Sequence, residues 1–266
     1  MRHYWIVIIL LIVFYNCETD SFKVIDSSEI TYPTTINRID TDQLSQMRYE
    51  YHQTNFFVLT SLNQFGYCDC CDDFGSSYGS SPPAVLNEVS ETYATEIAED
   101  FLILNKVYTG ILKKDKIRYS KKDYEEIGAD IYWHFKISNQ IVDSLEVLYS
   151  QVVIKVKNGK VTWCVGNWYP EIYIPTEFNY FQEDVKSILV DTVICHSGSW
   201  GDTWCETVTD SILEESNFRK VIVPIKTVSK IELRVSWEIN IPHPIYYKFY
   251  VDVITGKIIF KEPTII

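Results

Sequence analysis

The stretch VVIKVKNGKVTWCV, residues 152–165, constrains the fold more than any other part of the sequence. Asn-Gly is a strong hairpin signal, because a type I′ turn needs a positive φ at both of its central residues. The alternation of apolar and polar residues around Asn158-Gly159 predicts strands over 151–157 and 160–165. In the first strand Val152, Ile154 and Val156 are expected to share a face, and in the second Val161, Trp163 and Val165 are expected to share one. A chain with this hairpin contains an antiparallel sheet with one buried face.

Two predicted helices each precede a group of strands. Between Leu86 and Gly110, apolar residues recur at helical spacing at Val89, Tyr93, Ile97, Phe101 and Leu104. A second helix is expected after a capping box at 179–182 and carries Val185, Ile188, Leu189 and Val193. Further strands are expected at 130–137, 221–225, 230–241, 246–253 and 257–260. One helix followed by an antiparallel sheet, twice over, predicts an α+β fold.

The N-terminal region is less regular. Only residues 41–61 combine helical spacing with capping chemistry, which begins at Thr41. The stretch GYCDCCDDFGSSYGSSPP, residues 66–83, is dense in turn-forming residues and predicts a loop. We therefore expect a loop-rich N-terminal region before the two helix-and-sheet modules.

The charge of the chain limits its partners. The 266 residues include 36 acidic and 24 basic side chains, a formal net charge of −12. Nucleic acid and anionic membrane surfaces repel such a protein, so no nucleic-acid partner is expected. A hydrophobic fraction of 46% excludes a disordered chain.

The N-terminus predicts export. Arg2 precedes an unbroken apolar run from Tyr4 to Tyr15, which suits a signal peptide and is too short for a transmembrane helix. The run ends at Cys17 and resembles a bacterial lipoprotein signal, in which residues 1–16 are removed and Cys17 is lipidated. We expect a protein anchored to a membrane through lipid on Cys17, on the periplasmic or surface side of the cell envelope. A secretory signal cut elsewhere and an uncleaved short anchor are the alternatives.

The other cysteines favour disulfides. They are Cys68, Cys70, Cys71, Cys164, Cys195 and Cys205. An even number in an oxidising compartment predicts bridges, although the sequence does not fix their pairing. Cys195 and Cys205 bracket a Gly- and Ser-rich loop that a bridge would close, and Cys164 is a candidate partner for the Cys68–Cys71 group. That group lacks the second cysteine pair of a zinc site, so no metal or cofactor is expected.

Two stretches resemble known domains. Residues 130–170, with VVIKVKNGKVTWCVGNWYP and the pair Gly166-Asn167, are similar to the FTP (fungalysin/thermolysin propeptide) domain. Residues 230–260, with YYKFYVDVITGKII, resemble the PepSY domain and its V-D-x-x-T-G turn, here Asp252, Thr255 and Gly256. In the turn, Asp252 is expected to accept backbone hydrogen bonds, while Gly256 adopts a left-handed conformation. An FTP-like unit before a PepSY-like unit resembles the propeptide of thermolysin-like metallopeptidases.

The catalytic half of those zymogens has no counterpart in the sequence. H-E-x-x-H does not occur, and the histidines stand singly at 3, 52, 134, 196 and 243. The G-x-S-x-G match at 75–79 lies in a loop, without the strand and helix that a nucleophile elbow requires. His196 beside Ser197 and Ser199 reads as a solvated loop residue. No catalytic residue is therefore predicted.

These observations give four segments: a signal peptide at 1–16, an N-terminal extension at 17–85, an FTP-like module at 86–175 and a PepSY-like module at 176–266. The resemblance implies a non-catalytic, lipid-anchored protein that binds, inhibits or assists an exported peptidase or binds a peptide. Trp163, Trp168, Tyr169 and Tyr173 are expected in the core, with a peptide-contacting patch as the alternative. A binding or structural lipoprotein with an unrelated ligand, and an enzyme with an unrecognised site, are the other possibilities.

Overall fold

The computed structural model describes residues 31–56, 58–69, 89–197 and 203–264. The predicted signal peptide, Cys17, Cys70, Cys71 and the match at 75–79 lie outside the described residues, as do the side chains of His196 and Ser197 and all of Ser199. By internal contacts the chain divides into Met1–Thr31 and Tyr32–Ile266, and the elements below belong to the second unit. Their arrangement is α+β, with more strands than helices, which confirms the predicted class.

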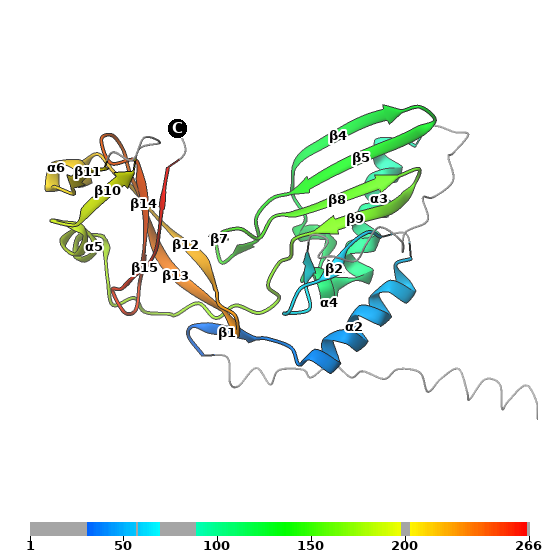
Figure 1. Cartoon of the computed structure of the whole chain (residues 1–266), viewed down its shortest axis with the longest axis horizontal. Helices are drawn as coiled ribbons and strands as arrows, with labels where there is room; N and C mark the ends of the chain where they lie inside the picture. The colour runs from blue at the N-terminus through cyan, green and yellow to red at the C-terminus, as the bar shows by residue number, and fades with distance from the viewer. Residues whose placement is uncertain (1–30, 57, 70–88, 198–202, 265–266) are drawn as a thin grey trace, which may run out of the picture. The chain divides into compact units, whose positions relative to one another are not determined.

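A four-stranded antiparallel sheet, the first sheet, is built from two hairpins of the chain (Figure 1). Its strands are β4 (Tyr119–Ile127), β5 (Asp130–Ile137), β8 (Val152–Lys157) and β9 (Lys160–Val165), in the order β4-β5-β8-β9. Asn158 and Gly159 have φ values of 50° and 74°, as the predicted type I′ turn requires. Strand β4 was not among the predicted strands.

The second arm of the hairpin differs from the prediction. A register shift between Lys155 and Val156 interrupts the β8–β9 pairing. Because an extra residue reverses the alternation beyond it, Val161 and Cys164 are buried, whereas Trp163 is only half-buried. The predicted shared face of Val161, Trp163 and Val165 is therefore wrong.

Helix α3 (Glu91–Leu104) packs on one face of the first sheet, and α4 (Lys106–Thr109) and the short helix η2 (Lys114–Lys116) follow it (Figure 1). Its buried residues are Ala94, Ala98, Phe101 and Leu102. The predicted apolar face is wrong at Tyr93 and Leu104, which are 54% and 78% exposed. The alanines were not counted as apolar positions, yet their small side chains let the helix lie close to the sheet.

Residues 32–69 are part of the two cores, and the prediction of a loop-rich region is wrong for them. Helix α2 (Thr41–Thr54) begins at the N-cap Asp40, one residue before the predicted start, and buries Leu44 and Tyr51 in the core beneath the first sheet. The hairpin of β2 (Ser61–Leu62) and β3 (Cys68–Asp69) joins the same core. Strand β1 (Thr34–Asn37) belongs to the other sheet.

The second sheet gathers seven strands from three regions of the chain. Its order is β15-β14-β13-β12-β7-β6, with β1 also paired to β13. The predicted strands correspond to β12 (Asn217–Lys226), β13 (Lys230–Ile241), β14 (Tyr247–Asp252) and β15 (Ile258–Pro263). Strands β6 (Ile141–Val142) and β7 (Leu145–Val147) were not predicted, and β7 pairs with β12 in parallel.

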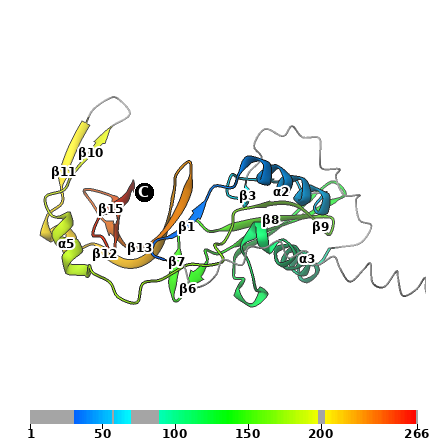
Figure 2. The ribbon, with the colours of Figure 1, turned by 90° about the horizontal axis from the view of Figure 1, so that it is seen from below.

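Helix α5 (Gln182–Leu189) and α6 (Asp210–Glu214) precede and follow a hairpin of β10 (Val193–Ser197) and β11 (Thr203–Thr207) (Figure 1; the hairpin and α5 also in Figure 2). They share a core cluster with β13 and β14 that includes Val185, Leu189, Leu213, Ile239 and Phe249. The capping bond of α5 runs from the Phe181 backbone N–H to Asp184 at 2.8 Å, two residues beyond the predicted capping box. Val193 belongs to β10, and not to the helix as predicted.

Candidate binding surface

Strand β4 forms an open edge of the first sheet. It pairs with β5 on one side, and no described strand pairs with its other side. Eight of its nine residues are exposed, and Tyr119 is half-buried. Backbone N–H and C=O groups along such an edge are available to another extended chain.

The opposite edge of the sheet, along β9, is covered by the segment 58–69. The Leu59 N–H donates to the Thr162 carbonyl at 2.7 Å, and the Gly166 N–H donates to the Cys68 carbonyl at 3.1 Å. The Thr60 hydroxyl accepts from the Cys164 N–H at 3.0 Å. The two edges of one sheet therefore differ in availability.

Side chains on the helix face hold β4 in place. Tyr119 donates to Glu99 of α3 at 3.2 Å, and Lys122 contacts Glu91 of α3 at 3.0 Å. Burial raises the pKa of Tyr119, and the nearby Glu99 carboxylate adds to the effect. The Tyr124 ring lies 4.9 Å from the ring of Trp133, centroid to centroid. The strand is thus fixed from one side while its outer edge stays open.

The other face of the sheet carries a row of cross-strand partners. Asp123 pairs with His134, His134 with Lys155, and Lys155 with Trp163. Burial and the positive charge of Lys155 lower the pKa of His134, and its Nε2 atom lies 3.7 Å from Glu125. The Lys155 ammonium lies 4.5 Å from the Tyr132 ring centre, a cation–π distance. This row mixes aromatic and charged groups without a nucleophile-and-base pair.

The V-D-x-x-T-G turn has the geometry expected of Asp252. Its carboxylate accepts from the Ile254 and Thr255 N–H groups at 2.9 and 2.8 Å and from the Tyr32 hydroxyl at 2.7 Å. Arg234 contacts the same carboxylate at 2.9 Å. Burial opposes ionisation, but these bonds keep the pKa of Asp252 below its ordinary value. Every one of these contacts lies within the chain, so the motif braces the second sheet.

Three other motif residues are also held by the fold. Gly256 has a φ of +65°, the left-handed conformation predicted for it. Gly166 has a φ of +95°, and a Cβ there would lie 2.0 Å from the Gln151 carbonyl oxygen. Asn167 is buried and donates to the Trp168 carbonyl at 3.0 Å. These positions shape turns and offer no group to a ligand.

The aromatic residues near the hairpin do not share one environment. Trp168 and Tyr169 are buried, at 6% and 1% exposure, as predicted for core residues. Tyr173 is 38% exposed, and Trp163 lies on the outer row of the first sheet. Of the four, only Trp163 belongs to this row, and it lies in β9 at the end of the row away from β4.

The disulfide predicted between Cys195 and Cys205 is present, between directly opposed residues of β10 and β11. Cys68 and Cys164 are free, buried thiols. Among the described residues, no group of three His, Cys, Asp or Glu side chains is placed to hold a metal ion. In the same part of the chain, no helix is both long and apolar enough to cross a membrane.

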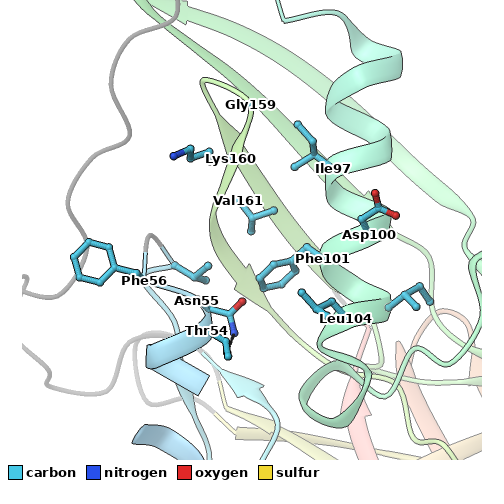
Figure 3. A pocket seen from close by; sticks show the side chains of 12 residues that line it. Thr54, Asn55, Phe56, Ile97, Asp100, Phe101, Leu104, Gly159, Lys160 and Val161 are labelled. Carbon is cyan, nitrogen blue, oxygen red and sulfur yellow. Dashed lines mark hydrogen bonds between the residues drawn. The ribbon is translucent and has the colours of Figure 1, made fainter. Parts of the chain in front are cut away.

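A groove of about 600 Å³ lies between the end of α2, helix α3 and the β8–β9 turn (Figure 3). Phe56 and Leu104 on its wall are 58% and 78% exposed. Asp100 and Lys160 are its charged residues, and Asp100 forms an ion pair with Lys114. The groove is an apolar surface with no catalytic constellation.

Strand β4, the open edge of the first sheet, was not predicted from the sequence. Lysine and glutamate are poor strand formers, so KKDYEE does not stand out as a strand. The available signal was Gly128-Ala129, a two-residue turn whose glycine has a φ of +64°. A glycine at the first turn position is typical of tight hairpins.

No known protein family and no curated protein sequence matches this chain. Among solved structures, the C-terminal domain of YpeB from Bacillus megaterium is similar, with a TM-score of 0.31 and 12% identity. The match covers 86% of this chain and 99% of that domain. A TM-score this low does not establish a shared fold, so no property of that domain is transferred here.

Proposed function

We propose that this protein is a non-catalytic, lipid-anchored extracytoplasmic protein that binds an exported peptidase by β-strand addition along β4. The observation that carries the proposal is the open edge of the first sheet along β4. Nine residues at about 3.3 Å each give an edge of roughly 30 Å, ample for an extended peptide or the rim of a peptidase cleft. Main-chain hydrogen bonds supply the affinity, and the β4 side chains select the partner.

The charges of β4 favour a partner other than a second copy. In an antiparallel pair of identical strands, the residue at the centre lies opposite itself. A centre at Lys122, Asp123 or Glu125 opposes two like charges, and a centre at Tyr124 sets Asp123 against Glu125. Like charges directly opposite each other are destabilising. These central repulsions weaken self-pairing, although the flanking pairs are opposite in charge, Lys121 with Glu125 around Asp123 and Lys122 with Glu126 around Tyr124. A partner strand of complementary charge avoids the central repulsion.

The cellular and modular parts of the proposal rest on the sequence. Export and the lipid on Cys17 come from residues 1–17, and the modules at 86–175 and 176–266 from the FTP-like and PepSY-like resemblance. The packing of α3 on the first sheet and of α5 against β13 and β14 is compatible with two helix-and-sheet modules. Strands β6 and β7 lie within the first module yet pair in the second sheet.

The intact mass of the membrane-extracted protein tests the lipid anchor on Cys17. An unmodified N-terminus at a residue other than Cys17 would contradict this part of the proposal.

A pair of proline variants tests the binding edge. Successive N–H groups of an edge strand point alternately toward the sheet and away from it, so Asp123→Pro and Tyr124→Pro remove one of each kind. Of these two variants, the one that unfolds at the wild-type midpoint has lost an N–H group that points away from the sheet and keeps its hydrogen bonds to β5. Used as bait on native envelope extracts, it should retain peptidase about ten-fold less than the wild type. Inhibition of the captured peptidase should weaken in parallel.

Proline variants at Phe260 and Lys261 in β15, the corresponding edge of the second sheet, are the matched control. The variant of that pair with an unchanged midpoint should bind peptidase as the wild type does. The proposal fails if no peptidase is enriched or slowed at micromolar protein, or if the folded β4 variant still binds. Capture of a non-peptidase partner through β4 would instead support the alternative of a binding lipoprotein with an unrelated ligand.

A further inference from the structure

Two buried thiols lie together beneath the first sheet. Cys68 is in β3 and Cys164 in β9, and their exposures are 1% and 0%. They belong to one core cluster with Tyr51 of α2, whose hydroxyl accepts from the Cys68 thiol at 3.8 Å. The proposed binding edge uses neither residue.

The backbone brings the two cysteines within bridging reach. The Gly166 N–H donates to the Cys68 carbonyl, so β3 lies alongside the end of β9 as a neighbouring strand does. Cys164 lies two residues before Gly166, diagonally across from Cys68, and both cysteine side chains lie in the same core cluster. A disulfide joins Cα atoms about 4.4 to 6.8 Å apart. The two thiols are already in hydrogen-bond contact, which together with burial raises the pKa of Cys164. No described carboxylate, lysine or metal ligand set is bonded to either sulfur.

We propose that Cys68 and Cys164 are joined by a disulfide when the protein folds in an oxidising environment. The two thiols give up two protons and two electrons as the S–S bond forms. The electrons reduce a disulfide oxidant, such as oxidised glutathione or an exported thiol oxidase, to two thiols that take up the protons. Exchange takes place before the core closes, because both sulfurs are buried in the folded chain.

The bridge would act on the covered edge of the first sheet. It closes a loop from residue 68 to residue 164, which contains α3, β4, β5 and β8. It also ties the segment 58–69 to β9, where that segment already bonds to Thr162 and Cys164. One edge of the sheet is then sealed covalently, and β4 stays the available edge.

Disulfide mapping tests the proposal without reliance on export. The full chain is refolded in a glutathione buffer oxidising enough to close Cys195–Cys205, then alkylated in denaturant and digested without reduction. The expected result is a peptide pair linking Cys68 to Cys164. It should persist in the control variant Cys70→Ala/Cys71→Ala. In Cys164→Ala, the Cys68 thiol should be alkylated before reduction.

Thermal unfolding gives a second readout. In a Cys195→Ala/Cys205→Ala background, reductant should lower the unfolding midpoint by about 5 to 15 °C, and adding Cys68→Ala/Cys164→Ala should abolish this shift. The inference is overturned if Cys68 and Cys164 are both alkylated before reduction in a sample with Cys195–Cys205 closed. A link from Cys164 to Cys70 or Cys71 overturns it as well. If the alanine variants do not fold, the wild-type peptide map decides alone.

Discussion

The first sheet is built from two hairpins within residues 119–165, whereas the second takes β6 and β7 from the segment between those hairpins and β1 from residues 34–37. Apolar packing against α3 supports the first sheet, and its ion pairs, such as Lys122 with Glu91, lie at the surface. The second sheet encloses the carboxylate of Asp252, which is fully buried against Arg234 and Tyr32. Local chain order thus builds one sheet, and specific polar contacts between remote segments join the other.

This difference predicts where substitutions cost most. A buried ion pair loses stability when one partner is removed, because the other charge stays buried and unpaired. A surface pair is largely replaced by water and salt. The first sheet should therefore be sensitive to backbone geometry and the second to the groups around Asp252.

The largest effect is expected for Asp252→Ala in the second sheet. Removing the carboxylate takes the acceptor from the Ile254 and Thr255 N–H groups and leaves Arg234 paired with Glu232 alone, which should cost about 3 to 5 kcal/mol of unfolding free energy. Urea denaturation measures it. Asp130→Ala, which breaks the more exposed pair with Lys157 in the first sheet, is the control and should cost far less. Equal losses would contradict the comparison.

A slightly smaller effect is expected for Gly166→Ala at the end of the first sheet. A methyl group there meets the Gln151 carbonyl oxygen at 2.0 Å while φ is +95°, so we expect a loss of about 2 to 4 kcal/mol. Gly128→Ala is matched in its positive φ of +64° but has no atom within 4 Å of the added carbon. It should lose about 1 kcal/mol. Similar losses would show that crowding plays no part.

Tyr32→Phe tests how the residue two positions before β1 is held by the Asp252 turn of the second sheet. The phenol donates to Asp252 at 2.7 Å, and its removal should cost about 2 kcal/mol, as for bonds to charged groups.

The same substitution should change how the stability depends on pH in the acid range. Because the folded pKa of Asp252 is depressed, its ionised form stabilises the protein above the ordinary aspartate value of about 4. That stability is lost as the pH falls through the lower folded pKa.

Without the Tyr32 bond the folded pKa of Asp252 should rise toward its ordinary value, so the pH-dependent part of the stability shrinks. Between about pH 2 and 6, the unfolding midpoint of Tyr32→Phe should fall less steeply with decreasing pH than that of the wild type. If the midpoint depends on pH as in the wild type, Arg234 and the turn amides alone determine the pKa of Asp252.

The smallest effect is expected for Lys122→Met, which breaks the surface contact with Glu91. The loss should stay below about 1 kcal/mol and vanish at high salt. Denaturation curves with and without salt measure it. A larger, salt-independent loss would place the α3–β4 contact among the structural determinants of the first sheet.

The same division explains what the sequence could predict. Strands β5, β8 and β9 and the Asn158-Gly159 turn follow from alternation and turn chemistry, which are local. The bulge beside Lys155 depends on how two strands meet and leaves no mark in the residues themselves. Strands β1, β6 and β7 are two to four residues long, so their pairing comes from distant partners. The open edge was not predicted because β4 carries charged residues along its length, which are poor strand formers.

The contact between Tyr32 and Asp252 spans 220 residues of chain, and it has a consequence for the order of synthesis. The ribosome releases Tyr32 first, and the sheet that it braces is complete only after β13 and β14 follow. At about 5 to 20 residues per second, that interval is roughly 10 to 45 seconds. Throughout it, the early strand β1 lacks β13, the strand with which it pairs.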